Sequence, residues 1–546
     1  METITVALIL LLAVIVSGAV ARMSPLSLPL PLIQIVIGAL IASVADLGVD
    51  LQPDIFFLLF LPPLLFLDGW RIPKEGLFRD KGTILELALG LVVFTVVGVG
   101  YFAHWLIPAM PLAVAFALAA IISPTDPIAV SAIAARVPIP RRLMHILEGE
   151  SLLNDASGLV CMRFAVAAAL TGSFSATAAF GTFLWLAIGG LAIGTGVTWT
   201  VTVTKNWISR RFGEETGSQI LISLLIPFGA YLLAERLHCS GILAAVAAGV
   251  TMSYAEQSGQ ALPVTRIRRS AVWDLIQFAA NGVMFVLLGE QFPQLFKGAA
   301  RIVHETGHHE PVWLVIYVVA INSALAALRF VWVWTSLRFT LFRAHLRGET
   351  PYVPSWRLIV ATSVAGVRGA ITLAGVLTLP LVMNDGSPFP ARDLAIFLAG
   401  GVIIVSLVAA SVTLPFLLNR LELPPETSHQ QDEDLARVAA AEAAIRAIEQ
   451  AQHDMGEGRS DADLYTDAGV RIMALYRQRI EGRSKVGKEA TLARKTDDIE
   501  RRLRLVGLRA ERAELFRIAR HHQLSDEVAR KLVREVDLLE SRFAVP

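Results

Sequence analysis

The chain has 546 residues, of which 54% are apolar and only 17% are charged. Water-soluble domains contain nearer a quarter of charged residues, so the composition excludes a single soluble globule. The charge is also unevenly spread, because the segment from Leu421 onward holds about 22 basic and 24 acidic residues. A net charge of +1 provides no basic field for nucleic acid. Composition therefore predicts a polytopic membrane protein with a polar C-terminal tail.

Apolar stretches long enough to cross a bilayer recur before the tail, and they predict an all-α membrane protein with about thirteen transmembrane helices. The first stretch lacks a basic n-region and carries Glu2, so we expect a retained helix and not a cleaved signal peptide. Cys161 and Cys239 lie in apolar surroundings and fit no disulfide or metal spacing. The stretches cover 4–20, 26–44, 54–70, 83–106, 111–136, 142–170, 178–204, 217–235, 239–254, 272–293, 312–340, 357–380 and 394–419.

Lysine and arginine are concentrated in alternate loops between these stretches. The loops after the odd-numbered stretches up to the eleventh are basic, and the positive-inside rule assigns them to the cytoplasm. We therefore expect a multi-pass protein of the cell membrane with its N-terminus outside and its tail in the cytoplasm. The alternate loops contain only Arg236, Lys297, Arg301 and Arg392.

The tail is predicted to form a separate helical domain. Residues 421–434 are polar and contain two prolines, which indicates a linker between the membrane domain 1–420 and a cytoplasmic domain 435–546. Leu524, Val528 and Leu532 have helical spacing, and Ser525 before two acidic residues predicts a helix N-cap. The tail has no catalytic motif, so we expect a regulatory unit that senses pH or binds a ligand or a protein, or a unit that only stabilises a dimer.

Charged residues within the apolar stretches need a reason, since a charge near the bilayer centre costs at least ~2.5–3.5 kcal/mol. Glu86, Arg163, Asp274 and Glu290 lie near predicted helix ends, where we expect their side chains to snorkel toward the interface. The charges that this explanation leaves are Asp68, Asp126, Glu150, Asp155, Arg329 and Arg368.

The stretch 111–136 is predicted to be a broken helix. Its centre reads Ser-Pro-Thr-Asp-Pro over residues 123–127. Each proline lacks an N–H, clashes with the carbonyl four residues earlier and pushes the preceding residue toward extended backbone. Unwound backbone at membrane depth is tolerated only where protein or a wet cavity surrounds it. The free carbonyls would lie beside the hydroxyl of Thr125 and the carboxylate of Asp126.

The next stretch carries Glu150, Ser151, Asn154 and Asp155, which form two pairs at i,i+4 spacing and so share one helix face. Small residues at 156–158 would let a neighbouring helix approach closely. Two carboxylates, a hydroxyl and an amide facing a broken helix are typical of an oxygen site for a hard cation such as Na⁺. The alternative is a buried polar network that only holds helices together.

The stretch 357–380 contains glycines at 366, 369 and 375 that weaken the helix, together with Arg368. Arg368 and Arg329 cannot lose their charge, so each needs a carboxylate or helix C-terminal carbonyls, and Glu150 and Asp126 are the candidate carboxylates. The two weakened stretches are the fifth of helices 1–6 and the fifth of helices 8–13. Broken helices at matching positions of oppositely oriented halves predict a transporter built on an inverted repeat.

Four segments resemble motifs of the sodium/proton exchanger (NhaP/NHE) branch of the monovalent cation/proton antiporter superfamily. They are 60–69, 123–127, 150–158 and 366–375, in this order along the membrane part. The resemblance implies an electroneutral Na⁺/H⁺ antiporter with a role in pH homeostasis, without a cofactor. It also implies a homodimer in which a core, about 83–170 and 312–419, moves against a dimer scaffold, about 4–70 and 178–293.

The resemblance also implies roles for single residues. Asp155 would bind cation and proton in turn, and Asn154 before it resembles the Asn-Asp pair of electroneutral exchangers. Thr125, Asp126 and Ser151 would complete the ion site. Glu150 would pair with Arg329, and Arg368 would offset charge where the broken helices cross. Asp68 matches an acidic position of the family's third helix.

Burial of Asp155 without a partner cation disfavours its charged form, which would make a proton and Na⁺ compete for it. If only the filled site can cross the barrier, one cation is exchanged for one proton. K⁺/H⁺ exchange or a mixed preference including Li⁺ would use the same oxygen ligands. A channel gated by the tail and a membrane-embedded enzyme are further alternatives. The cluster at His304, Glu305, His308 and His309 lacks HExxH spacing and indicates an ordinary polar loop.

Overall fold

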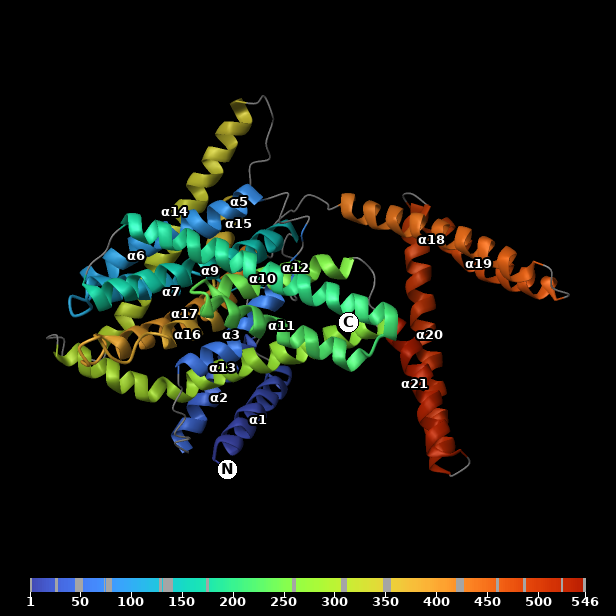
Figure 1. Ribbon diagram of the computed structural model, residues 1–546, viewed down its shortest axis with the longest axis horizontal. Coiled ribbons are helices and arrows are strands. Elements are labelled where there is room, and N and C mark those ends of the chain that lie inside the picture. The colour runs from blue at the N-terminus through green and yellow to red at the C-terminus, as the bar shows by residue number, and fades with distance from the viewer. Residues whose placement is uncertain are drawn as a thin grey trace. The chain divides into compact units, whose positions relative to one another are not determined.

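A computed structural model of the chain describes residues 2–24, 28–44, 53–72, 74, 81–126, 130, 141–172, 176–257, 262–305, 312–346, 355–418, 427–457, 461–484, 488–521 and 524–543. Over these residues the protein is helical, apart from loops and an isolated β-bridge between Val382 and Pro388. The chain divides into two compact units, Met1–Glu422 and Leu423–Pro546 (Figure 1).

Each apolar stretch predicted from the sequence contains helix in the first unit. Many helices extend past the predicted ends, as α13 does at both of its ends. The helices are α1 (Glu2–Met23), α2 (Leu30–Val44), α3 (Pro53–Arg71), α5 (Lys81–Leu85), η1 (Glu86–Leu91), α6 (Val92–Leu106), α7 (Leu112–Ile122), α9 (Arg141–Thr171), α10 (Ala176–Phe212), α11 (Thr216–Arg236), α12 (Gly241–Gln257), α13 (Pro263–Glu305), α14 (Val312–Leu346), α15 (Trp356–Val364), α16 (Ala370–Leu377) and α17 (Arg392–Leu418).

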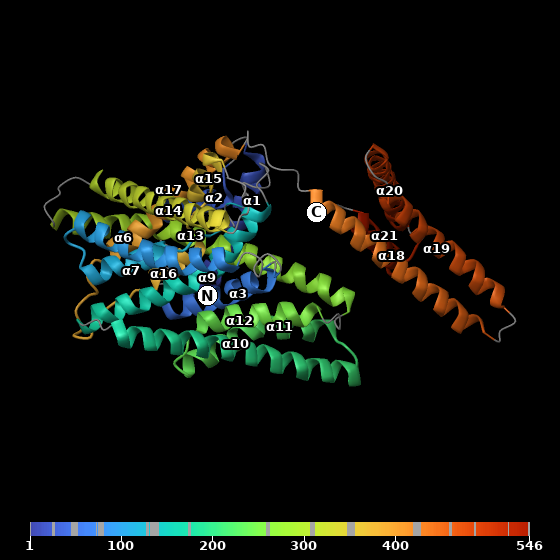
Figure 2. The same ribbon diagram turned by 90° about the horizontal axis from the view of Figure 1, so that it is seen from above.

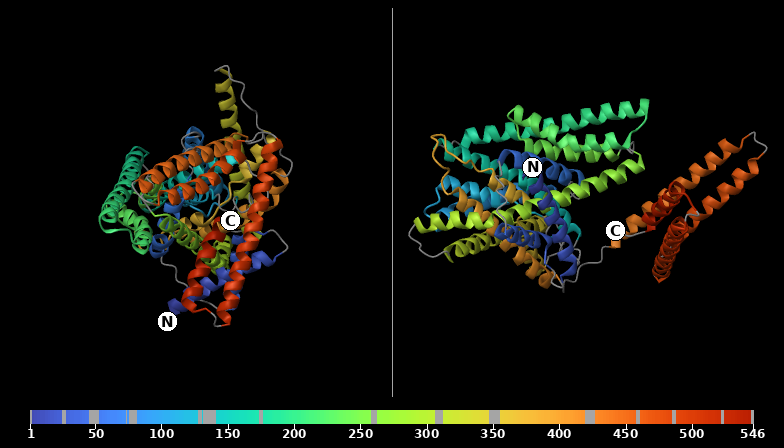
Figure 3. Two further views of the ribbon diagram at one scale, coloured as in Figure 1. Left: turned by 90° about the vertical axis from the view of Figure 1, so that its right-hand side faces the viewer. Right: turned by 90° about the horizontal axis from the view of Figure 1, so that it is seen from below.

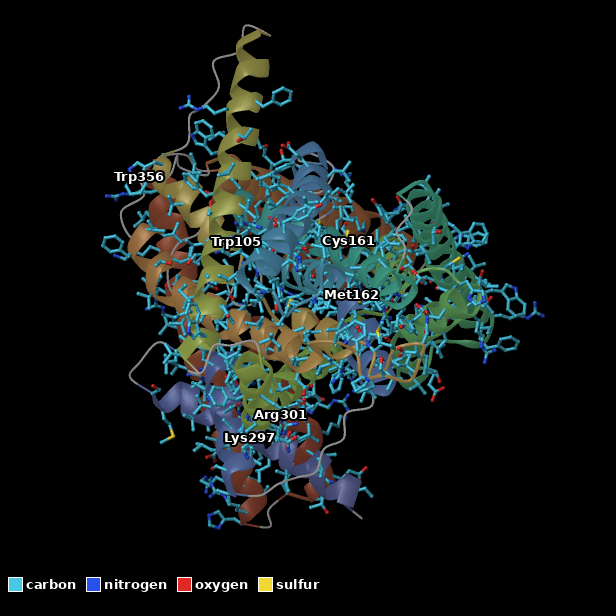
Figure 4. All side chains as sticks on the ribbon, turned by 90° about the vertical axis from the view of Figure 1, so that its left-hand side faces the viewer. Trp105, Cys161, Met162, Lys297, Arg301 and Trp356 are labelled. Atoms are coloured by element: carbon cyan, nitrogen blue, oxygen red, sulfur yellow. The ribbon has the colours of Figure 1, made fainter. Side chains whose placement is uncertain are left out.

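Eight helices in the described part of the chain are long and apolar enough to cross a membrane, and α2, α7 and α12 are shorter apolar helices. Large apolar side chains remain exposed along them. Trp105 on α6 and Trp356 at the start of α15 are examples, with 72% and 65% of their surfaces accessible (Figure 4). A water-soluble protein rarely exposes so much apolar surface, so the first unit is membrane-embedded.

The first unit contains two sets of helices that pack mainly among themselves. In one set, α3, α10 and α11 contact α12, while α1 and α2 contact α13; in Figure 2, α10, α11 and α12 run side by side. In the other set, α7 packs against α6 and α9, and α17 packs against α14, α15 and α16. The sets meet where α16 contacts α3 and α13, and where α13 contacts α17.

Glycines bring the helices of the first set into direct backbone contact. A β-carbon at Gly38 of α2 would overlap the carbonyl of Val286 on α13, and one at Gly289 of α13 would overlap the carbonyl of Ile35 on α2. The same reciprocal contact joins α3 and α12. There, Gly69 faces the carbonyl of Val246 and Gly249 faces the carbonyl of Phe66. Small residues of this kind allow close helix packing in membranes.

The second unit is a set of four described helices, α18 (Thr427–Gly456), α19 (Ala462–Ser484), α20 (Lys488–Arg520) and α21 (Asp526–Phe543) (Figure 3). Helix α18 packs against α19, and α20 packs against α21 with ion pairs from Arg512 to Asp537 and Glu540. The Ser525 hydroxyl accepts a hydrogen bond from the Val528 N–H at 3.4 Å, as expected for the predicted N-cap. Helix α18 begins at Thr427, within the segment 421–434.

Candidate functional site: two broken helices and a buried acidic face

Helix α7 ends at Ile122, and residues 123–126 are not helical. The predicted break is therefore present over these residues, while Pro127 lies outside the described part of the chain. The Ser123 hydroxyl donates to the carbonyl of Ala120 at 3.1 Å. Only 4% of Thr125 is exposed, so its hydroxyl belongs to the interior of the unit. The break thus presents polar backbone and side-chain groups within the membrane-embedded part.

The stretch 357–380 is also broken, because α15 ends at Val364 and α16 begins at Ala370. The two breaks lie against each other. The N–H of Asp126 donates to the carbonyl of Val367 at 2.7 Å, and the Asp126 carboxylate lies so close to Gly369 that a β-carbon there would overlap it. Glycine is therefore required at 369 for contact between the two interrupted helices.

Arg368 lies in the second break and is 5% exposed. Its Nε donates to the carbonyl of Ile122 at 2.9 Å, and its Nη1 donates to the carbonyl of Gly366. Ile122 is the last residue of α7, so its carbonyl has no intrahelical partner. The expected partners of Arg368 were a carboxylate or helix C-terminal carbonyls; the structure gives it the carbonyl at the end of α7 and a second backbone carbonyl within the break. The guanidinium neutralises the negative end of α7 at the crossing.

Helix α9 presents Glu150 and Asn154 to the first break. The Asn154 amide Nδ2 donates to Thr125 Oγ1 at 3.0 Å and to Glu150 Oε1 at 3.4 Å, and the Thr125 hydroxyl donates to the same Glu150 oxygen at 3.3 Å. Asn154 Oδ1 is buried and has no hydrogen-bond partner among the described residues. An unpartnered buried acceptor is unusual, and here it is available to a cation.

Glu150 also forms a two-pronged ion pair with Arg329 of α14. Arg329 Nη1 lies 2.5 Å from Glu150 Oε1, and Nη2 lies 2.7 Å from Oε2, while Nε donates to the carbonyl of Thr362 on α15. Both charged side chains are almost fully buried. The paired guanidinium and carboxylate match each other geometrically, so the charge of Glu150 is neutralised by a fixed partner.

Asp155 follows Asn154 on α9, and only 3% of it is exposed. Among the described residues, its carboxylate has no hydrogen-bond or ion-pair partner. The charged side chains that act on it are Asp68, Asp126 and Glu150, all of them acidic. Asp155 is therefore a buried carboxyl group without a cationic partner, and its charge can be balanced by a proton or a bound cation.

A small cavity of about 20 Å³ lies between the two sets of helices, with room for about one water molecule. Four oxygen-bearing side chains line it, together with three apolar residues. Asn281 of α13 was not predicted from the sequence. Its side chain is an uncharged amide, which does not stand out in an apolar stretch as a charged residue does. Asp155 does not line this cavity. The polar lining residues are Asp68, Asp126, Ser151 and Asn281.

The prediction that charged side chains near predicted helix ends extend toward the interface is correct in part. Asp274 of α13 is 60% exposed at its side chain and forms an ion pair with Arg71 of α3. Glu290 is only 4% exposed, so the prediction that it snorkels to the interface is wrong. Its helix continues to Glu305, which places Glu290 well before the end of α13 instead of at it.

Arg163 of α9 forms an ion pair with Glu235 of α11, with Nη2 at 2.8 Å from Oε1. Cys161, labelled in Figure 4, is half-buried, Cys239 is buried, and both thiols are free. The described residues include no cluster of three His, Cys, Asp or Glu side chains that could hold a metal ion. Of the predicted polar loop, His304 and Glu305 belong to helix α13 instead, whereas His308 and His309 lie outside the described residues.

Residues 8–420 match the family of sodium/hydrogen exchanger transmembrane regions. The chain is 41% identical to the uncharacterized Na⁺/H⁺ exchanger YjcE of Escherichia coli, over 99% of both chains. It is 36% identical to a sodium, potassium, lithium and rubidium/H⁺ antiporter of Bacillus subtilis, over 100% of this chain and 79% of that protein.

The fold is similar to that of the sodium proton antiporter MjNhaP1 from Methanocaldococcus jannaschii, with a TM-score of 0.60 at 18% identity. The similarity covers 77% of this chain and 99% of that one. The matched membrane region, the relatives of nearly full length and the antiporter fold agree with the motifs around the crossing. The chain belongs to the sodium/hydrogen exchanger family, within the monovalent cation/proton antiporter superfamily.

Proposed function

We propose that the protein exchanges Na⁺ for H⁺ across the cell membrane, and that the two ions compete for the carboxylate of Asp155. The observation that carries the proposal is the environment of this group, which is buried, faces only acidic charges and has no partner among the described residues. A bare carboxylate in that position is unstable, so it is occupied by either a proton or a cation.

The cation site is proposed to include oxygen atoms around the crossing. The unpartnered Oδ1 of Asn154 is one candidate ligand, and the hydroxyl of Thr125 is a second. Ser151 and Asp126 line the nearby cavity, which would carry the cation toward Asp155 and away from it. Hard monovalent cations favour ligands of this kind, and Asp68 and Asn281 complete the polar lining of the route.

Fixed pairing makes the exchange electroneutral in this proposal. Arg329 neutralises Glu150 in both loaded forms, and Arg368 offsets negative charge at the crossing. Only the occupant of Asp155 then changes, and a proton and Na⁺ carry the same charge. The name of the Bacillus subtilis relative includes potassium, lithium and rubidium, which supports a second candidate function of mixed selectivity in which K⁺ and Li⁺ also serve.

The architecture that we infer has thirteen transmembrane helices in an inverted repeat, with the N-terminus outside and the tail in the cytoplasm. The reciprocal glycine contacts support the repeat, because exchanging the two halves maps the α2–α13 pair onto the α12–α3 pair. The core, about 83–170 and 312–419, would move against a scaffold formed by about 4–70 and 178–293. The scaffold would form a homodimer, and the second unit would be a regulatory domain.

The proposal is tested by cation-induced dequenching of a pH dye in proteoliposomes, with Na⁺, Li⁺ and K⁺ added in turn. We expect Asp155→Asn to abolish dequenching with every cation, because an amide can neither take up a proton nor balance a cation. Asp274→Asn is the matched control. It makes the same chemical change at an exposed carboxylate that pairs with Arg71 and takes no part in the crossing of the broken helices. It should retain exchange at the level of the unmodified protein.

Two outcomes would contradict the proposal. Cation-dependent proton flux through Asp155→Asn, in protein shown to be inserted and folded, would remove Asp155 from the exchange step. Uptake of ²²Na⁺ without proton movement in the opposite direction would indicate a channel instead of an antiporter. Dequenching by K⁺ and Li⁺ as strong as that by Na⁺ in the unmodified protein would replace the first candidate function by the second.

A further inference from the structure

A groove and a cavity lie next to each other along α10, outside the ion site. The groove has a volume of about 440 Å³ and is apolar apart from one hydroxyl. The cavity has a volume of about 270 Å³, and all but one of its lining residues are polar or charged. The groove is lined by Ile193, Gly196, Val197, Thr200, Val201 and Leu233. The cavity is lined by Lys205, Asn206, Ser209, Arg210, Glu214, Gln219 and Leu262.

The two hollows follow one stripe of the helix. Ile193, Val197 and Val201 line the groove at intervals of four residues, and the same interval leads to Lys205 and Ser209 in the cavity. Residues at this spacing lie above one another on a helix face. Sixteen residues at 1.5 Å each span roughly 24 Å, which is close to half the thickness of a bilayer, at about 20–22 Å.

Helix α11 forms the opposite wall of both the groove and the cavity, and its polar and apolar lining residues lie at the same ends as those of α10. Gln219, near its start, lines the cavity, and Leu233, near its end, lines the groove. The surface therefore changes from apolar to charged once, between Val201 and Lys205, as the surface of a membrane protein does between the acyl chains and the headgroups of the lipids.

The cavity contains buried polar atoms that lack partners. Only 6% of Gln219 is exposed; its Nε2 donates to Ser209 at 2.9 Å, but its Oε1 has no partner among the described residues. Glu214 Oε1 is likewise buried and unpartnered, although Oε2 accepts from the N–H of Leu262. Unpartnered buried acceptors are rare in native proteins, so an occupant with hydroxyl donors would satisfy both.

The lining charges are Lys205, Arg210 and Glu214, which leave one net positive charge facing the cavity. Arg269 is a further buried cation that acts electrostatically on Lys205, and only 1% of it is exposed. Its Nη1 pairs with Glu256, but its Nε and Nη2 have no partner within the described chain. The occupant that complements this arrangement carries one negative charge, several acceptor oxygens and hydroxyl donors. A phosphodiester with a glycerol headgroup has these properties.

We propose that the α10–α11 surface is a binding site for an anionic phospholipid of the phosphatidylglycerol type. Its phosphate lies between Lys205 and Arg210, its headgroup hydroxyls donate to Glu214 and Gln219, and one acyl chain lies in the groove past Val197. By the orientation proposed above, the site faces the inner leaflet. The site does not depend on Asp155 or on the direction of transport.

Native mass spectrometry of the delipidated full-length protein tests this assignment, with phosphatidylglycerol and phosphatidylcholine of equal chain length as probes. We expect preferential binding of phosphatidylglycerol. The double variant Lys205→Gln with Arg210→Gln should weaken it about 30-fold, at about 1 kcal/mol for each cation. The control is Arg211→Gln with Arg268→Gln, two exposed arginines that do not line the cavity. It should leave the affinity unchanged.

The groove is tested with glycine variants of α10. A β-carbon at Gly196 meets no atom within 4 Å, and Gly196 lines the groove, so Gly196→Leu places an apolar side chain where the acyl chain is proposed to lie. We expect it to reduce phosphatidylglycerol binding. Gly181 is equally open but does not line the groove, which makes Gly181→Leu the matched control.

Three results would overturn the assignment. Equal binding of phosphatidylcholine, unaffected by the charge variants, would show a nonspecific lipid surface. Full displacement of the lipid by inorganic phosphate or glycerol phosphate would show a site for a soluble anion. A change of oligomeric state in Gly196→Leu without loss of lipid would show that a second copy of the chain occupies the groove.

Discussion

Glu150 and Arg329 illustrate how single residues determine the chemistry of the crossing. Their side chains are 1% and 3% exposed, and the pair links α9 to α14 while Arg329 also contacts α15 through Thr362. A buried pair of this kind contributes little net stability, because desolvation offsets the attraction between the charges. Removal of only one of the two charges is strongly destabilising, because the other charge then stays buried without a partner.

We expect Glu150→Gln to destabilise the protein by about 3–5 kcal/mol, the usual effect of leaving one buried charge unpaired. The measurement is thermal unfolding of the purified protein in detergent. Glu235→Gln is the matched control, because it breaks the half-exposed pair with Arg163 and should change stability by about 0–1 kcal/mol. Equal effects of the two substitutions would contradict the structural role given to Glu150.

Whether the role of a single residue can be predicted depends on how far that role is encoded locally in the sequence. Buried charges such as Glu150 and Asp155 stand out in apolar stretches, because their energetic penalty is large and local. Glu290 was assigned to a helix end incorrectly, since hydropathy does not fix where a long helix stops. Asn281 could not be identified, because its contribution depends on α3, α9 and α16 meeting α13, which is a tertiary property.

At the scale of helices, the crossing depends on two interruptions with different local causes. Pro124 ends α7, whereas glycines allow the chain to leave α15 and to begin α16 after five intervening residues. Proline and glycine effects are local, so both breaks could be predicted from the sequence. The hydrogen bond from Asp126 to Val367 could not, because it joins segments about 240 residues apart.

Gly369→Ala tests the contact between the broken helices. The added β-carbon would overlap the Asp126 carboxylate, so we expect the two breaks to be pushed apart and exchange activity to fall at least tenfold. Gly229→Ala is the matched control, because a β-carbon at Gly229 of α11 would meet no atom within 4 Å. Exchange is measured by dye dequenching in proteoliposomes, and normal exchange by Gly369→Ala would refute the required close contact.

The loop between α16 and α17 contains a titratable group whose behaviour follows from its contacts. Asp385 accepts hydrogen bonds from the Ser387 N–H at 2.9 Å and from the Ser387 hydroxyl at 2.6 Å, and these bonds lower the pKa of Asp385. Because the pKa of Asp385 is lower in the folded state than in the unfolded state, the ionised carboxylate stabilises the folded protein at pH values above the unfolded pKa. This stabilisation is lost only as the pH falls through the lower, folded-state pKa.

Asp385 should therefore stay ionised throughout the neutral range. We expect Asp385→Ala to lower the melting temperature slightly and by the same amount at pH 6 and at pH 8. Differential scanning fluorimetry at both values is the measurement. A difference between variant and unmodified protein that changes from pH 6 to pH 8 would contradict this expectation and would make the loop a pH-sensitive element.

At the scale of the whole molecule, the charge of the loaded carrier determines which gradients drive it. The proposal gives the sodium-loaded and proton-loaded forms the same net charge, because Asp155 alone changes its occupant. A transmembrane potential, at about 2.3 kcal/mol per elementary charge per 100 mV, would then do no work on either form.

We therefore expect Na⁺/H⁺ exchange at the same initial rate with the membrane potential clamped at zero and at −100 mV. The measurement uses proteoliposomes with a valinomycin-set potential and a fixed pH gradient. Asp155→Asn liposomes under the same clamp correct for leak. A rate that depends on the clamped potential would show that an additional charge moves with the core, and Asp68 and Asp126 would be the first groups to examine.

The reciprocal glycine contacts of α2 with α13 and of α3 with α12 constrain how such a machine can work. Where a carbonyl rests directly on a glycine, no side chain intervenes whose rotamer could change, so each helix pair has a single packed arrangement. In the proposed transport cycle, each of these helix pairs would therefore behave as one rigid body within the scaffold. Sliding would occur along surfaces joined by adaptable side chains, such as Arg163 and Glu235, and a single methyl group at Gly38 or Gly249 would loosen the helix pair that it enters.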